Sequence, residues 1–128
     1  MRRRTFLALA AAGLAALAGG GAAAHGFRRD LAAARQRLAG RSRLILTRQG
    51  RIELAEAGSG PPLLMVHGTG GGFDQALAFG APLAALGWRV LAPSRIGYLR
   101  SDYPPGSTPA SEADGFPDLL DALGIDRL

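Results

Sequence analysis

The sequence predicts an α/β domain with a largely parallel sheet, preceded by an apolar N-terminal helix, and three observations predict it. From residue 43 onward the expected elements alternate between strands and helices. A short apolar run at residues 63–66 leads into a glycine-rich loop, which is typical of a buried parallel strand. A longer apolar run follows arginines at the N-terminus. We therefore divide the chain into residues 1–24, 25–42 and 43–128.

Residues 1–24 have the pattern of a secretory signal peptide or a membrane anchor. A charged head at residues 2–4 precedes an apolar run at residues 6–24, and Ala22-Ala23-Ala24 fits an A-x-A cleavage site. The paired arginines of the head also resemble the twin-arginine export signal. An uncleaved anchor stays open, because about nineteen apolar residues come near the length that spans a bilayer. We expect a protein that is exported, periplasmic or extracellular, or that is anchored to the inner membrane.

The composition is globular, with 48% hydrophobic residues, no cysteine and a net charge of +5. The absence of cysteine excludes a disulfide framework and a thiolate metal site. Most of the arginines lie in residues 1–51, beside the apolar run, so the charge indicates membrane attachment through the N-terminus rather than nucleic-acid binding. Residues 25–42 accordingly predict a basic linker helix. No group of acids and histidines has metal-ligand spacing, and we expect no metal and no cofactor.

The globular part begins with a predicted hairpin, made of strands at residues 44–47 and 51–57. The second of these strands alternates with period two. The apolar run at residues 63–66 predicts a strand buried on both faces. The remaining elements are a helix at residues 76–86, a strand at 88–93, a helix at 110–123, and the approach to a further strand at 125–128. Pro117 either kinks the helix at residues 110–123 or marks its true start.

The segment from His67 to Gly72 carries the chemistry that the sequence offers. Its glycines allow a sharp turn and leave backbone N–H groups uncovered, and such groups can hold a negative oxygen. A phosphate-binding loop is the weaker interpretation, because the Walker pattern needs a lysine and the Rossmann pattern needs a glycine where Phe73 stands. An oxyanion hole for acyl transfer is favoured. A flexible turn stays open for Gly70–Gly72.

Three segments, in this order and spacing, resemble the α/β-hydrolase superfamily. They are residues 63–74, with their His-Gly-x-x-Gly pattern, residues 87–101, and the end of the helix at residues 119–125. The resemblance implies an incomplete α/β-hydrolase fold over about residues 43–128. It implies that the backbone N–H of Thr69 or Gly70 is an oxyanion donor, that Phe73 begins the next helix, and that four loop residues have structural roles: His67, Gly68, Gly71 and Gly72. Many members have Asp where Ser94 stands and Gly where Leu99 stands.

The nucleophile elbow of this family, G-x-S-x-G, is absent from the sequence, and His25 and His67 are its only histidines. His67 precedes the loop, where the family uses it structurally. The family's acid follows its nucleophile, so we interpret Asp74 and Asp102 as capping or loop residues. We predict no catalytic residue in this chain: nucleophile, acid and base are all missing.

We therefore expect an N-terminal hydrolase fragment, truncated before the elbow and inactive alone. Its full-length parent would cleave an ester, thioester or lactone by acyl transfer, and a small-molecule substrate would bind only when the domain is completed. In the family the third strand lies beside the fifth, so residues 63–66 would form an open edge that favours self-association. The alternatives are a membrane-tethered, non-catalytic binding domain and one half of a split enzyme.

Overall fold

The computed structural model describes residues 2–128, with side chains from residue 19 onward. The chain separates into two compact units, divided between Ala39 and Gly40. In the first unit a single helix, α1, spans Arg2–Leu38. The predicted signal or anchor depends largely on residues 2–18, whose side chains lie outside the description, so it stays a prediction, as do the boundaries at residues 24 and 42. None of the helices in the described part combines the length and the apolarity needed to cross a bilayer.

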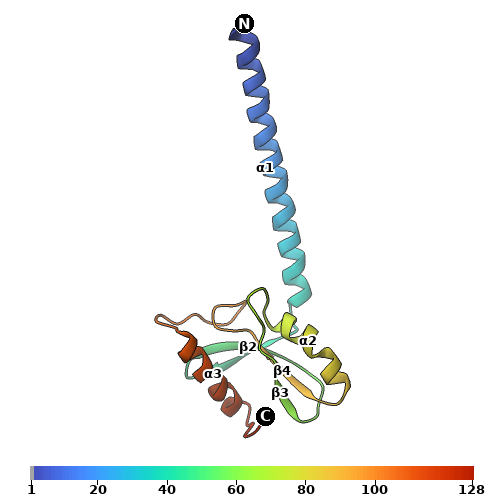
Figure 1. The fold of residues 1–128 in the computed structure, drawn as a ribbon, viewed down its shortest axis with the longest axis vertical. Helices are drawn as coiled ribbons and strands as arrows, with labels where there is room; N and C mark the ends of the chain where they lie inside the picture. The colour runs from blue at the N-terminus through green and yellow to red at the C-terminus, as the bar shows by residue number, and fades with distance from the viewer. Residues whose placement is uncertain (1) are drawn as a thin grey trace. The chain divides into compact units, whose positions relative to one another are not determined.

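The second unit is built on a four-stranded sheet with the order β1-β2-β4-β3 (Figure 1). Strands β1 (Arg43–Thr47) and β2 (Gly50–Ala57) form the predicted antiparallel hairpin. Strand β4 (Arg89–Pro93) pairs antiparallel with β2 and parallel with β3 (Pro62–Leu64). The expected α/β class and the parallel pair are therefore confirmed.

The two helices of this unit flank the sheet, which lies between them in Figure 1. Helix α2 (Phe73–Ala85) packs against β4 and β2, and α3 (Pro109–Ala122) packs against β1. Three leucines of the core, Leu54, Leu91 and Leu119, are completely buried. Each contributes roughly 1.5–3 kcal/mol relative to an exposed position, so they hold α3 to the sheet.

Helix α3 begins earlier than Pro117, which lies inside it. The hydroxyl of Thr108 accepts the Ser111 amide at 3.1 Å, and Pro109 occupies the first turn. Together these residues form a strong start signal. The alternative that Pro117 marks the start of the helix is therefore wrong.

Strand β3 differs from the strand predicted at residues 63–66. It ends at Leu64, its residues are only half-buried, and Val66 is 40% exposed. It pairs with β4 on one side only, so within the described residues the other edge has no covering strand. Burial on both faces was therefore a wrong prediction, whereas the edge position agrees with expectation. Residues 125–128 form no strand, and the Ile125 amide instead bonds the Leu120 carbonyl at 3.0 Å.

Helix α2 approaches the sheet closely at Gly80, and this contact predicts a measurable cost of adding one methyl group. A Cβ built on Gly80 would lie 2.6 Å from Val90 Cγ1. We expect Gly80→Ala to destabilise the unit by about 1 kcal/mol, because overpacking costs about 1–3 kcal/mol and the gain in helix propensity offsets part of it. Urea unfolding would measure it. The double variant Gly80→Ala/Val90→Ala should be more stable than the sum of its single changes; strict additivity would contradict the clash.

Candidate active-site loop

The glycine loop, defined as residues 67–72, connects the end of β3 with the start of α2. His67 is buried, the next three residues are exposed, and Gly72 is buried at the N-cap of α2. A Cβ on Gly72 would lie 2.3 Å from Leu99 Cδ1, so a larger residue here would have to displace the Leu99 side chain. Phe73 is 1% exposed and begins α2, the position that the resemblance implied.

The amides of Thr69 and Gly70, the two candidate donors, bond no acceptor within the described residues and lie at the surface. The amide of Gly71, next to Gly70, also bonds no acceptor within the described residues, whereas the amides of Gly68, Gly72 and Phe73 are engaged. Side-chain oxygens accept from three: Gly68 N–H donates to Gln75 Oε1 at 2.9 Å, Gly72 N–H to Asp74 Oδ1 at 3.2 Å, and Phe73 N–H to Ser94 Oγ at 3.1 Å. Exposed N–H groups without an acceptor can donate to a negative oxygen.

His67 has both ring nitrogens engaged inside the chain. Its Nε2 lies 2.9 Å from the backbone nitrogen of Arg95, and its Nδ1 lies 2.7 Å from the Gly68 carbonyl oxygen. A backbone N–H can only donate, so this network assigns the lone pair to Nε2 and the proton to Nδ1, as in a neutral imidazole. The ring also packs edge-on against Tyr98, with centroids 4.8 Å apart. Neither nitrogen is left for proton exchange with a substrate.

The segment after β4, residues 94–102, lies against the glycine loop and is fixed to α3. The Arg95 guanidinium makes two hydrogen bonds to the Glu112 carboxylate, at 2.9 and 2.7 Å. The Tyr98 hydroxyl donates to the Thr69 carbonyl oxygen at 3.1 Å. This 94–102 segment therefore connects α3 with the candidate donors.

A buried carboxylate, Glu53, lies beneath the same segment and was not recognised in the sequence. It is 2% exposed on β2, where Ile52, Leu54 and Ala55 are also buried, so the predicted period-two alternation of this strand is wrong. The 94–102 segment covers the face that alternation would have left to solvent. Four donors reach the Glu53 carboxylate: Ser42 Oγ at 2.6 Å, Arg100 Nε at 2.6 Å, Arg100 N at 3.0 Å and Ser94 Oγ at 3.2 Å.

The carboxylates of this network predict how stability depends on pH. Burial alone would raise the pKa of Glu53, but hydrogen bonds from Ser42 and Arg100 outweigh it and the pKa lies below its ordinary 4.5. Hydrogen bonding from Arg95 likewise lowers the pKa of Glu112. A carboxyl group whose pKa is lower in the folded state than in the unfolded state stabilises the fold. This stabilisation is complete at pH values above the unfolded-state pKa. We expect the free energy of unfolding to be level above about pH 5 and to decrease as pH falls through these lowered values. Urea titrations across pH 2–7 would measure it, and a maximum below pH 4 would contradict it.

The remaining acids of interest have structural partners. Asp74 lies in the first turn of α2 and accepts the Gly72 amide. Asp102 accepts both the backbone N–H of Arg51, at 2.9 Å, and its guanidinium, at 2.8 Å. These contacts are those of a capping and a loop residue. Among the described residues, no group of three potential ligands is placed to hold a metal ion.

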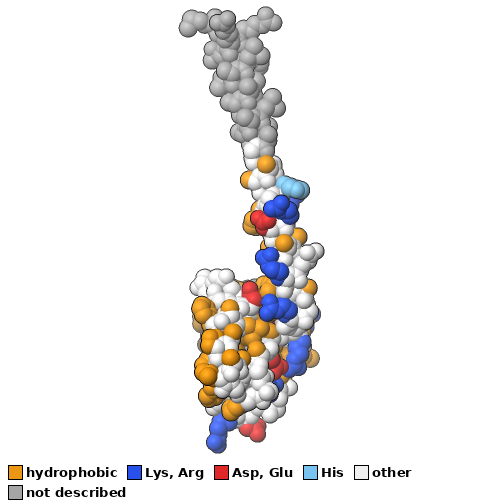
Figure 2. Space-filling view, turned by 90° about the vertical axis from the view of Figure 1, so that its right-hand side faces the viewer, with side chains coloured by type: hydrophobic (Ala, Val, Ile, Leu, Met, Phe, Trp, Pro, Cys, Tyr) orange, Lys and Arg blue, Asp and Glu red, His pale blue; other side chains and the backbone are white. Residues whose placement is uncertain are grey.

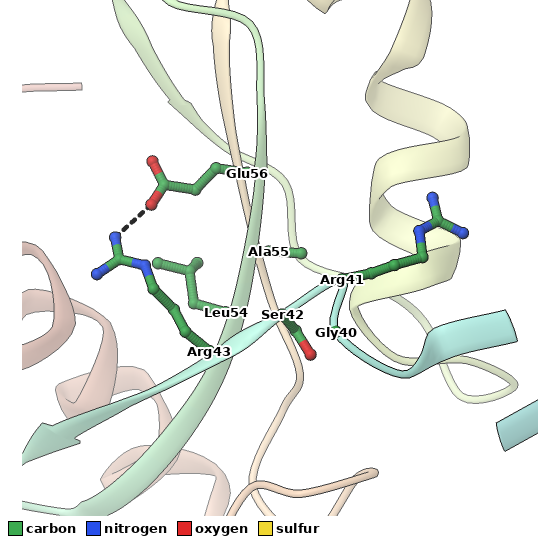
Figure 3. Close-up of a pocket in the computed structure, with 7 residues that line it drawn as sticks. All are labelled: Gly40, Arg41, Ser42, Arg43, Leu54, Ala55 and Glu56. Atoms are coloured by element: carbon green, nitrogen blue, oxygen red, sulfur yellow. Dashed lines mark hydrogen bonds and ion pairs between the residues drawn. The ribbon is translucent and has the colours of Figure 1, made fainter. Parts of the chain in front are cut away.

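An open depression of about 240 Å³ lies away from the glycine loop, between the start of β1 and the end of β2 (Figure 3). Its lining includes Arg43 and Glu56, which pair with each other, and Arg41, which extends in another direction. Glu56 also pairs with Arg89. The charges of this depression are thus neutralised within the chain, except for Arg41 at its rim.

The outward face of α2 and the turn after it are apolar. Phe79 is 69% exposed, Leu86 77% and Trp88 39%. Figure 2 shows apolar side chains over much of the face of residues 40–128 that it presents. Exposed apolar surface of this kind is typical of a face that contacts further protein.

The hairpin, the parallel strand–helix–strand–helix order and the glycine loop between β3 and α2 together define the N-terminal portion of the α/β-hydrolase fold. No protein-family model matches the chain. An α/β-hydrolase-fold protein from Nakamurella multipartita is 37% identical, with a TM-score of 0.63 over 66% of this chain and 29% of its own. An epoxide hydrolase from an endophytic Streptomyces is 36% identical, with a TM-score of 0.57 over 66% of this chain and 27% of its own.

A curated relative agrees with these structures. It is the 2-hydroxy-6-oxo-6-phenylhexa-2,4-dienoate hydrolase of Burkholderia cepacia, which is 35% identical over 85 residues, or 60% of this chain. The chain spans only 21–29% of the length of the curated relatives that it matches. The fold of residues 40–128 is therefore that of an α/β-hydrolase, and the partial sheet of the structure matches the incomplete fold that the sequence predicted.

Proposed function

We propose that residues 40–128 supply the oxyanion-hole loop of an α/β-hydrolase domain that cleaves a small-molecule ester, thioester or lactone. The observation that carries the proposal is that the exposed amides of Thr69 and Gly70, just before the N-terminus of α2, have no acceptor in the part of the chain that the structure describes. Preorganised N–H donors at such a place stabilise the negative oxygen of a tetrahedral intermediate. The positive end of the α2 dipole acts in the same direction.

The 128 residues contribute electrostatic stabilisation and not the attacking group. They include no G-x-S-x-G elbow, and the described surroundings of His67, Asp74 and Asp102 engage each of these side chains with the chain itself. In the proposed reaction a serine, a histidine and an acid from other residues carry out acyl transfer. We accordingly propose that the 128-residue chain does not hydrolyse substrate by itself.

The test is to complete the domain. The 128-residue chain would be fused to the part of the Nakamurella protein that follows its matched segment, and assayed with p-nitrophenyl butyrate, a thioester and a lactone. We expect turnover of at least one substrate by the fusion and none by the chain alone. A fusion in which the residue at the nucleophile position of the elbow is replaced by alanine is the control for contaminating esterase.

Two results would contradict the proposal. One is ester turnover by the chain alone that persists after repurification. The other is a folded fusion that opens an epoxide, such as styrene oxide, and leaves all three acyl substrates intact. The second result would place the chain with the chemistry named for its Streptomyces relative.

A further inference from the structure

We propose that His67 and Tyr98 are positioning residues that aim the two oxyanion donors, each by holding the carbonyl oxygen of the peptide group that carries a donor. The inference rests on the proposed function for its catalytic meaning. Its geometric part stands on contacts within this chain.

The argument begins with the peptide group. A trans peptide is planar, with its C=O and the following N–H pointing in opposite directions, and the described part of the chain contains no cis peptide. Fixing the carbonyl of one residue therefore fixes the direction of the next residue's N–H. His67 Nδ1 holds the Gly68 carbonyl at 2.7 Å and so aims the Thr69 N–H. The Tyr98 hydroxyl holds the Thr69 carbonyl at 3.1 Å and so aims the Gly70 N–H.

The glycine loop needs such contacts because its backbone is otherwise free to rotate. Glycine adopts positive and negative φ angles about equally well, and Gly68 and Gly70 flank Thr69 at the surface. A rotated peptide would present its carbonyl oxygen, which repels an oxyanion, in place of its N–H. Donors aimed before the reaction need no reorganisation during it.

The two holding side chains also hold each other. Their rings are in edge-on contact, at 69° to one another. The Arg95 amide fixes His67 Nε2 at 2.9 Å, and the Arg95 guanidinium lies 5.9 Å from the centre of the Tyr98 ring. Arg95 is in turn paired with Glu112 of α3. The 94–102 segment therefore holds the backbone of the glycine loop in a fixed position relative to α3.

The first test needs no variant. The ¹⁵N spectrum of the full chain, labelled at histidine, should show His67 with its proton on Nδ1 and a bare Nε2 that accepts a hydrogen bond. Magic-angle spinning gives the same measurement on associated material. A proton on Nε2 would overturn the assignment of His67 as the holder of the Gly68 carbonyl.

The second test removes one hydroxyl. In Tyr98→Phe we expect the ¹⁵N order parameter of the Gly70 amide to fall, while amides of β2 and β4 keep theirs. The matched control is Tyr103→Phe, the same change on a side chain that is 70% exposed, and it should leave Gly70 as in the wild type. An unchanged Gly70 amide in Tyr98→Phe would overturn the inference.

The catalytic consequence is measured in the fusion described above. Tyr98→Phe should lower kcat about tenfold with KM unchanged, the effect of about one hydrogen bond on the barrier, and Tyr103→Phe should match the wild type. A loss of order at Gly70 with an unchanged kcat would refute the oxyanion role of that amide, and would leave the geometric part standing. An ordered Gly70 with a reduced kcat would refute the geometric part.

Discussion

Replacing Gly70 with proline should lower kcat of the completed enzyme about 10²–10³-fold, the cost of removing one oxyanion-hole donor. Proline has no N–H, so the change deletes one of the two proposed donors and adds no charge. Its effect should appear in kcat rather than in KM, because the donor acts on charge that develops only in the transition state. The measurement is a steady-state comparison with p-nitrophenyl butyrate.

The matched control at this position is Gly70→Ala, which retains the N–H. A Cβ on Gly70 would meet nothing nearer than Gln75 Nε2, at 4.0 Å, and Gly70 is not among the residues with positive φ. We expect the alanine variant to keep kcat within about threefold of the wild type, a difference of less than 1 kcal/mol. Equal kcat losses in the two variants would assign the effect to backbone distortion, and an active proline variant would assign the oxyanion to another donor.

Local patterns in the sequence sufficed to predict the loop but not what holds it. The run His67–Gly72 is readable because a strand, glycines and a helix start follow one another in the chain. Tyr98 and Arg100 act on partners 29 and 47 residues away, and nothing in a local pattern indicates such pairs. Glu53 was missed for the same reason, because an alternating strand predicts a solvated acid until the segment that covers it is known.

The departures from the family pattern have physical explanations in the structure. Leu99 has φ +50°, in the left-handed region that glycine adopts without cost, so leucine carries about 1–2 kcal/mol of strain where many members have Gly. The hydroxyl of Ser94 donates to Glu53 and accepts from the Phe73 amide. An ionised aspartate could accept from Phe73 but could not donate to a charged Glu53. Ser94 therefore suits a chain in which a buried carboxylate lies beneath the 94–102 segment.

Replacing Glu53 with glutamine should lower the free energy of unfolding by about 1–3 kcal/mol, the usual cost of leaving a buried hydrogen-bonding group unsatisfied, because the Arg100 side chain is 53% exposed and solvent screens the ion pair itself. Both carboxylate oxygens accept, one from Ser42 and Arg100 and the other from Arg100 and Ser94. A glutamine NH₂ cannot accept, so at least one buried donor loses its partner, and the Arg100 charge loses its counterion. Urea unfolding would measure the change, with Trp88, the single tryptophan, as the fluorescence probe.

The control is Glu56→Gln, on the same strand three residues further along. Glu56 is more accessible, with 22% of its side chain exposed, and its two partners, Arg43 and Arg89, are 56% and 32% exposed. Ion pairs accessible to solvent contribute about 0–1 kcal/mol each, so this variant should lose less stability than Glu53→Gln. If the two variants lose similar stability, charge at β2 matters rather than burial beneath the 94–102 segment. If Glu53→Gln does not fold while Glu56→Gln unfolds cooperatively, the buried carboxylate holds that segment, and with it Tyr98, against the glycine loop.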